Sequence, residues 1–191
     1  MKSLKGSQTE KNILTAFSGE SQARNRYNFF AKRAYEDGFV LARKIFDQTA
    51  DQEEQHAKRL FKFLEGGELQ ISGTFPAGVI KHTYDNLIEA AAGEREEYSQ
   101  MYPNFADVAM KEGYVEVANV MTNIASAERF HEKRYLDLAK WIKVDTIFKN
   151  SEETEWYCMN CGCIVTSKDA PSACPACFHP TAWFRRLNIE W

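Results

Sequence analysis

One ten-residue pattern occurs twice in this chain and constrains the fold more than any other feature. Ala-x-x-Glu-x-x-His-x-Lys-Arg occupies residues 50–59 and again residues 125–134, so Glu53 and Glu128 lie 75 positions apart. Tyr27 and Tyr102 have the same spacing of 75, whereas Gly19-Glu20 recurs as Gly93-Glu94 with a spacing of 74. The chain therefore contains two copies of one unit, and we expect a functional site built symmetrically between them.

The repeated region is predicted to be helical. Residues 1–75 contain no proline, and Gly38, Gly66 and Gly113 follow charged residues where a helix C-cap favours glycine. These signals predict four helices, over residues 4–36, 39–65, 80–111 and 114–143. The 66–79 segment, about 14 residues long, could extend roughly 46 Å and run back along the helices. Two tight hairpins joined by one long crossover form a ferritin-like four-helix bundle.

The rest of the chain differs sharply in composition. All five cysteines of the 191 residues lie after Trp156, and three of the four tryptophans lie at or beyond that residue. Such a short segment is too small to form a core alone, which favours a loop-rich fold held by metal. We therefore predict two domains, a helical bundle over residues 1–146 and a small metal-binding domain over 147–191.

The buried faces of the predicted helices carry acids. In the fourth helix, Glu128 and His131 follow the same alternating spacing as Met121, Ile124 and Tyr135. The second helix repeats this arrangement with Glu53 and His56, and the first and third helices place Glu20 and Glu94 on their apolar faces. A single such Glu is usually an edge residue whose carboxylate reaches water, and a single such His is usually a hydrogen-bonded core histidine. Four carboxylates driven into one core would repel each other unless cations neutralise them.

The number and type of these residues indicate a two-metal site. One Glu on each of two helices and Glu-x-x-His on each of the other two is the ligand set of di-iron and di-manganese carboxylate bundles. Glu97, one turn beyond Glu94, breaks the repeat because its counterpart is Ala23. We expect Glu97 to be a seventh ligand that makes the two metals unequal; the alternative is a solvated charge in an acidic run.

The cysteines form a second metal motif. Cys158-x-x-Cys161 and Cys174-x-x-Cys177 supply two pairs of thiolates, a strong signal for a tetrahedral four-sulfur site. This spacing does not separate iron from structural zinc, and Cys163 is left over as an ordinary thiol. His82 and the outer charged faces are interpreted as solvated surface.

Composition excludes several function classes. Hydrophobic residues make up 44% and charged residues 27%, which excludes disordered and fibrous proteins. A net charge of −3 provides no basic surface for nucleic acid. No apolar run approaches about 18 residues, and the first ten residues are polar, so we expect no membrane span and no secretory signal. We predict a cytoplasmic protein, where thiols stay reduced.

Taken together, these motifs resemble the rubrerythrins over essentially the whole chain. The resemblance is carried by Glu20, Glu53-x-x-His56, Glu94-x-x-Glu97, Glu128-x-x-His131 and the four cysteines at 158, 161, 174 and 177. It implies a ferritin-like domain with two non-haem irons, a rubredoxin-like domain with one iron bound by four cysteines, and reduction of hydrogen peroxide to water.

The resemblance also implies roles for individual residues. In the family, one iron exchanges a carboxylate matching Glu97 for a histidine matching His56 when the redox state changes. Tyr27 and Tyr102 match tyrosines that surround the di-iron ligands. The residues that match those around the rubredoxin-type iron, where they tune its potential, are Asn160, Ala176 and His179. At Cys163 an aromatic residue would be more usual.

Partners follow from the same resemblance. It implies a homodimer in which the rubredoxin-like domain of one subunit serves the di-iron site of the other, with electrons from an external rubredoxin or NAD(P)H-dependent reductase. Two other functions compete with peroxidase: a ferroxidase or iron-handling protein, and a non-enzymatic helical scaffold with a zinc ribbon. An electron-delivery domain argues against iron storage, and the core carboxylates argue against a scaffold.

Overall fold

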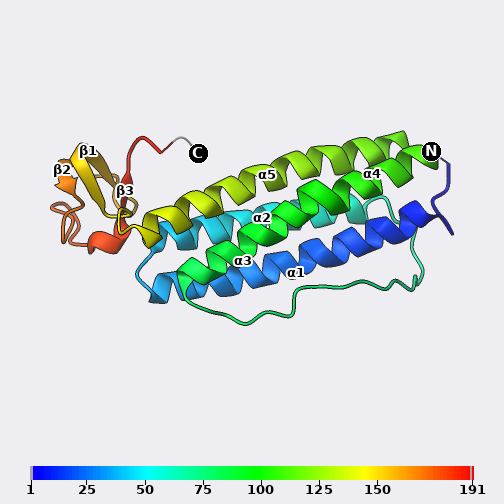
Figure 1. Cartoon of the computed structure of the whole chain (residues 1–191), viewed down its shortest axis with the longest axis horizontal. Helices are drawn as coiled ribbons and strands as arrows, with labels where there is room; N and C mark the ends of the chain where they lie inside the picture. The colour runs from blue at the N-terminus through cyan, green and yellow to red at the C-terminus, as the bar shows by residue number, and fades with distance from the viewer. Residues whose placement is uncertain (1, 190) are drawn as a thin grey trace.

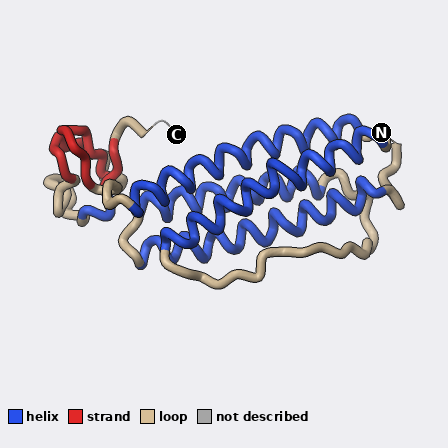
Figure 2. Tube along the Cα trace, in the orientation of Figure 1, coloured by secondary structure: helices blue, strands red, loops and turns tan. Residues whose placement is uncertain are grey.

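A four-helix bundle makes up most of the molecule, as Figures 1 and 2 show. The computed structural model describes residues 2–189 and residue 191. The helical elements in chain order are α1 (Gln8–Glu36), α2 (Val40–Phe61), α3 (Thr83–Glu96), the π-helix η1 (Glu97–Met101), α4 (Tyr102–Lys111) and α5 (Val115–Lys143). The segment α3–η1–α4 forms one continuous rod, so the bundle with a long crossover is confirmed.

The two hairpins turn in the same way. Gly38 and Gly113 have positive φ angles of 84° and 83°, a conformation that costs glycine little and other residues more. The N–H of Phe39 donates to the carbonyl of Ala34, and the N–H of Tyr114 donates to that of Ala109, each at 2.8 Å. The predicted copies thus end their first helix with the same hydrogen-bonded cap.

The helix ends differ from the predicted ones by a few residues. Helix α1 begins at Gln8 rather than at residue 4, because the Ser7 side chain caps it by accepting from the N–H of Glu10. Helix α2 ends at Phe61 rather than at residue 65. The third helix, predicted to be uninterrupted, contains the π-helical turn η1.

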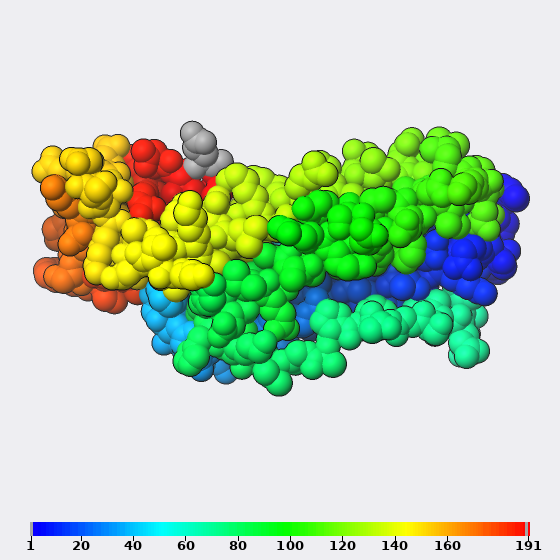
Figure 3. Space-filling model, in the orientation of Figure 1, coloured from blue at the N-terminus to red at the C-terminus, as the bar shows by residue number. Residues whose placement is uncertain are grey.

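The crossover runs along the outside of the bundle. In Figures 1 and 3 it extends the length of the bundle beside α1, from the end of α2 to the start of α3. Its end is fixed by Asn86, whose side chain accepts from the N–H of Lys81 and donates to the Lys81 carbonyl. The two hairpins are therefore joined across the whole bundle, as the length of this segment predicted.

Two apolar clusters hold the bundle, and the acids lie between them. One cluster includes Tyr27, Phe46 and Leu138, and the other includes Ile13, Leu60 and Met121. Full burial of each large side chain stabilises the fold by about 1.5–3 kcal/mol. These two clusters stabilise a central layer of carboxylates that would destabilise the bundle by itself.

A small antiparallel sheet follows the bundle. Its strands are β1 (Lys149–Cys158), β2 (Ile164–Asp169) and β3 (Phe184–Arg186), in the order β2-β1-β3, with a short 3-10 helix η2 (Thr181–Trp183) before β3. Trp156, Phe184, Cys158 and Cys174 form its core. Five residues, 144–148, join α5 to this sheet. The predicted boundary between residues 146 and 147 falls within them and stays a prediction.

The chain's last residues contact the bundle. The ring of Trp191 stacks on Trp141 with centroids 5.6 Å apart, and its Nε1–H donates to Asp137 at 3.1 Å. Phe148, just before β1, stacks on Phe39 at the turn of the first hairpin. Within the described residues, no helix is both long and apolar enough to cross a membrane.

Candidate metal centres

Four helices bring six of the seven predicted bundle ligands together. One group contains Glu20, Glu53, His56 and Glu128, and the other contains Glu53, Glu94, Glu128 and His131, with the candidate ligand atoms of each group within 4.8 Å of one another. Glu53 and Glu128 belong to both groups. Two metal positions that share two carboxylates are the arrangement that the repeat predicted.

Hydrogen bonds orient His131. Arg134 donates to Oε1 of Gln52 at 3.1 Å, so that atom is an acceptor, and Nε2 of His131 lies 3.1 Å from it. Nε2 must therefore carry the proton, which directs Nδ1 to the acids. Nδ1 lies 2.7 Å from Glu128 and 3.1 Å from Glu53. This atom is placed to bind a metal.

The tyrosines connect the two hairpins. Tyr27 of α1 donates to Glu94 of α3, and Tyr102 of α4 donates to Glu20 of α1. Both rings are buried. Each hairpin thus orients the glutamate on the first helix of the other hairpin, so both copies are needed for this arrangement.

Charge in the cluster is balanced by the histidines. Burial, followed by the negative charge of Glu53, raises the pKa of Glu94 to about 8. Burial also opposes ionisation of Glu53, but the imidazoles of His131 and His56 close to its carboxylate outweigh it and lower the Glu53 pKa to about 2. Although burial lowers the pKa of His131, the carboxylates of Glu128, Glu53 and Glu94 around its Nδ1 raise it to about 12. In the absence of metal, the positive charge of the protonated histidines balances the carboxylates, a role that metal cations would otherwise fill.

The donor set fits two metal ions. Within the described part of the chain, five buried carboxylate oxygens accept no hydrogen bond: Oε2 of Glu20, Oε1 of Glu53, Oε2 of Glu94 and both oxygens of Glu128. Buried unpaired acceptors are costly, so such a group requires cations. Carboxylates with imidazole suit iron, manganese or zinc, and bridging carboxylates bring two ions close together.

Glu97 lies on the π-helix rather than on a regular helical turn. It is half-buried and belongs to neither four-residue group. Burial, then the charges of Glu94 and Glu20, raises its pKa, so its carboxyl group lies close to the cluster. The expectation that Glu97 is a seventh ligand is untested by this geometry and stays a prediction.

The π-helix was not predicted from the sequence, although the sequence carries a signal for it. The repeat offset changes from 74 at Glu20 and Glu94 to 75 at Tyr27 and Tyr102, so the second copy has one extra residue between them. A π-turn accommodates one residue inside a helix without changing the rest. This insertion lets Tyr102 keep the place that Tyr27 has in the first copy while Glu97 is added beside the acids.

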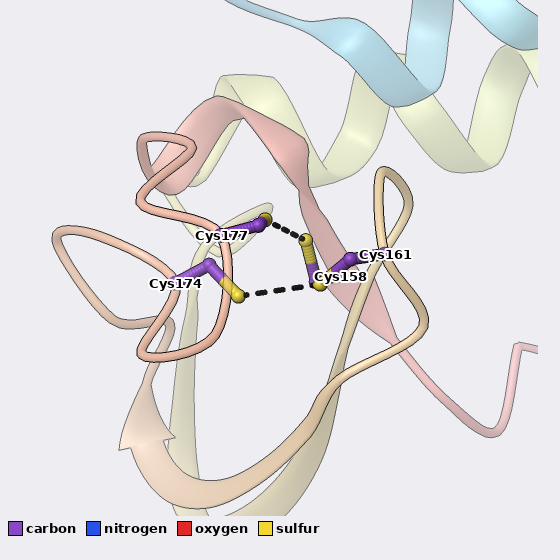
Figure 4. A group of neighbouring side chains, drawn as sticks. All are labelled: Cys158, Cys161, Cys174 and Cys177. Atoms are coloured by element: carbon purple, nitrogen blue, oxygen red, sulfur yellow. Dashed lines mark hydrogen bonds between the residues drawn. The ribbon is translucent and has the colours of Figure 1, made fainter.

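The second site lies in the small sheet. Figure 4 shows the four cysteines facing one another, with the sulfurs of Cys158 and Cys177 3.7 Å apart and those of Cys161 and Cys174 3.6 Å apart. None of these cysteines is in a disulfide. Sulfur atoms at van der Waals separation around one point fit a tetrahedral metal ion.

The residues expected around this site contact its sulfurs. The backbone N–H of His179, assisted by the Asn160 side chain, lowers the pKa of Cys177 to about 6. Burial opposes ionisation of Cys174, but the backbone N–H groups of Ala176 and Cys177 outweigh it and lower its pKa. These contacts favour thiolates, the form that binds metal. Cys163 lies beside the four and outside their group.

Comparisons with known proteins decide the family. The family model "Rubrerythrin" matches residues 11–139, and the model "Rubrerythrin, rubredoxin-like domain" matches residues 156–185. A rubrerythrin of Nitratidesulfovibrio vulgaris is 60% identical over 191 residues, which cover both chains fully. The chain belongs to the rubrerythrin family. It is therefore a redox di-iron protein with a ferritin-like bundle and a rubredoxin-like domain, as the resemblance predicted.

Other rubrerythrin relatives agree. A rubrerythrin of Porphyromonas gingivalis is 50% identical over 190 residues, covering all of this chain and 95% of that one. Fully reduced, all-ferrous nigerythrin superposes with a TM-score of 0.63 at 30% identity, covering 96% of this chain and 91% of that one. Symerythrin from Cyanophora paradoxa, at 21% identity and a TM-score of 0.63 over 75% and 89% of the two chains, shares the fold.

Two further residues were not found from the sequence. Gln52 and Arg134 hold His131, and Arg134 is only 2% exposed although outer charged residues were expected to be solvated. Arg134 belongs to the repeated motif, but its counterpart Arg59 is exposed and pairs with Glu116. The repeat alone therefore could not show which arginine is buried. His82 is exposed as expected, although it contacts Arg33.

Proposed function

We propose that this protein is a peroxidase that reduces hydrogen peroxide to two molecules of water, consuming two electrons and two protons. The observation that carries the proposal is the combination of a two-metal carboxylate cluster and a four-thiolate site in one chain. Two bound irons in the bundle would supply the two electrons, and the iron of the four cysteines would relay replacements one at a time.

The chain's own residues prepare the bundle site. Tyr27 and Tyr102 hold Glu94 and Glu20 in place, and Gln52 directs Nδ1 of His131 inward. We propose that Glu97 and His56 are alternative ligands of one metal. Nδ1 of His56 already lies 2.9 Å from carboxylate oxygens of both Glu53 and Glu128. Glu97 lies outside both four-residue groups.

Electron delivery between two subunits is part of the proposal. His131 lies 12 residues before the end of α5, so the cluster is roughly 18 Å along the helix axis from the sheet that follows. The sheet is packed at the end of its own bundle, away from the cluster (Figure 1). A head-to-tail homodimer would bring one subunit's cysteines to the other's cluster. An external rubredoxin or NAD(P)H-dependent reductase in the cytoplasm would supply the electrons.

The test separates the two sites. Replacing Cys158 and Cys161 with Ser should remove the iron of the tail, since hydroxyls bind iron far more weakly than thiolates do. The bundle should stay folded, retain two irons of the three in the parent, and still be oxidised by one equivalent of peroxide. Steady turnover with a reductase and nicotinamide donor should collapse. A matched Cys163→Ser variant should keep all three irons and its turnover.

Two outcomes would contradict the proposal. Steady turnover of the double variant near the parent rate would mean that the four-cysteine site is a structural element. Zinc at these cysteines in protein carefully loaded with iron would likewise exclude the relay. Rapid iron oxidation without peroxide consumption would favour the ferroxidase alternative.

A further inference from the structure

A cavity of about 520 Å³ lies beside the bundle cluster, and the proposed reaction with hydrogen peroxide does not account for its size. Its walls come from α1, from the rod formed by α3, η1 and α4, and from the crossover that runs beside α1 in Figure 3. Glu97 lines it directly. Gly19 and Gly93 also line it, and they immediately precede the candidate ligands Glu20 and Glu94. The cavity therefore leads to the metal cluster.

The two glycines keep this space empty. Both lie inside long helices, where glycine is less stable than alanine. Close helix contact does not explain them, because a Cβ atom added at either position would meet nothing within 4 Å. Neither requires a positive φ angle. Gly19 and Gly93 are counterparts in the repeat, so both copies omit a side chain at the same cavity.

The lining combines apolar walls with charged groups. Phe75, Pro76, Met101 and Phe105 provide the apolar walls, and the charged side chains in the lining are Arg26, Glu96 and Glu97. The ring of Phe75 packs against its own chain, since a Cβ at Gly73 would lie 3.1 Å from it. Hydrogen peroxide is little larger than water, which takes up about 30 Å³ in the liquid. A cavity this large and apolar exceeds what that substrate needs.

We propose that the cavity binds organic hydroperoxides, with the peroxide group toward Glu97 and the organic group against the crossover. The inference rests on the proposed peroxidase function and extends it to a second substrate class. The O–O bond of ROOH breaks, two electrons from the bundle irons and two protons are consumed, and ROH and water are released. The same external reductase supplies the electrons.

The experiment measures binding and turnover on the full iron-loaded chain. Equilibrium dialysis of 2-phenyl-2-propanol, the alcohol product of cumene hydroperoxide, against the oxidised protein should show saturable binding. Gly93→Leu, which fills the cavity, should weaken this binding at least tenfold and lower the ratio of cumene hydroperoxide to hydrogen peroxide turnover at least tenfold. Ala92→Leu, at the exposed neighbouring position, is the matched control and should change neither.

A second variant guards against misfolding. Phe75→Glu places a charge in the apolar wall from a loop rather than from a helix, so it should weaken binding of the alcohol while the helices stay intact by circular dichroism. Equal binding by the parent, Gly93→Leu and Phe75→Glu would overturn the proposal. Turnover of hydrogen peroxide without turnover of cumene hydroperoxide would overturn it as well and leave the peroxidase function standing. Failure with both peroxides would instead refute the peroxidase function itself.

Discussion

The two hairpins supply the same residues to the cluster, yet they hold them differently. His131 of the second hairpin is 2% exposed and is fixed through Nε2 by Gln52 and Arg134. The side chain of His56 in the first hairpin is 17% exposed, and Nε2 forms no hydrogen bond among the described residues. One histidine of the cluster is therefore anchored by hydrogen bonds and the other is less constrained, as the proposed exchange of His56 and Glu97 requires.

The extra residue of the second hairpin lies between Glu94 and Tyr102, where the π-helix carries Glu97. Glu97 is half-buried between the cluster and the cavity, while its counterpart Ala23 is buried and apolar. A duplicated bundle thus becomes asymmetric through one inserted residue and one buried arginine. The role of Glu97 and the anchoring by Arg134 can each be tested by substitution.

Removing the added carboxylate should remove the asymmetry. Glu97→Ala should slow hydrogen peroxide turnover at least tenfold, which corresponds to about 1.4 kcal/mol in the barrier, because the proposed exchanging ligand is lost. The six remaining ligands should still hold two irons, and the visible spectrum of the four-cysteine iron should be unchanged. The control Glu54→Ala removes an exposed acid on α2 and should not affect turnover. Normal turnover of Glu97→Ala would make Glu97 a solvated charge only.

Substituting Arg134 and Arg59, which are counterparts in the repeat, should show which hairpin is anchored by its arginine. Arg134→Met should lower the free energy of unfolding by about 2–3 kcal/mol, because it removes the hydrogen bonds of a buried guanidinium to the buried Thr49 and the half-buried Gln52. Arg59→Met removes an exposed ion pair and should cost no more than about 1 kcal/mol. Urea denaturation of both variants measures the difference. Equal losses would contradict the distinction between the halves.

The metal-free bundle should lose stability as pH rises from 5 to 9. The pKa of Glu94 is raised from 4.5 to about 8, so its stabilising contribution is present below pH 4.5 and is lost as pH passes 8. His131, raised from 6.5 to about 12, contributes a loss of the same sign above pH 6.5. Thermal melts of chelator-treated protein measure this, and iron-loaded protein should lack the slope. A metal-free melting temperature that rises over this range would exclude the charge balance described above.

The smallest expected effect concerns the two similar cysteine loops of the rubredoxin-like domain, residues 158–162 and 174–178. Gly162 after Cys161 has φ 79°, and Phe178 after Cys177 has φ 58° although it is not glycine. Each N–H donates to the first cysteine carbonyl of its loop at 2.9 Å. Phe178→Gly should therefore stabilise the rubredoxin-like domain by about 0.5–1 kcal/mol, since glycine adopts positive φ without strain. Denaturation followed at the iron–thiolate absorbance checks this, and destabilisation would mean that the exposed ring packs favourably.

The sequence was sufficient for the bundle, the crossover and the cysteine site because each has a local signature. Glycine caps, the 75-residue repeat and the two Cys-x-x-Cys pairs are read from neighbouring residues along the chain, and helical periodicity then directs Glu20, Glu53, Glu94 and Glu128 inward. The structure confirmed the bundle and brought these acids together. The change of the repeat offset from 74 to 75 was also visible in the sequence, but only the structure showed that the extra residue forms a π-helix.

Tertiary structure decided what no local pattern specifies. Whether Arg134 or Arg59 is buried depends on which residues of α2 and α5 meet, and the exchange of Tyr27 and Tyr102 between hairpins depends on how the two copies pack. The cavity beside Glu97 exists because the crossover, distant in sequence, covers two helical glycines. Sequence alone determined which donor atoms face the core, because helical period is a property of neighbouring residues. Their partners and the empty space beside them are properties of packing between segments far apart in the chain.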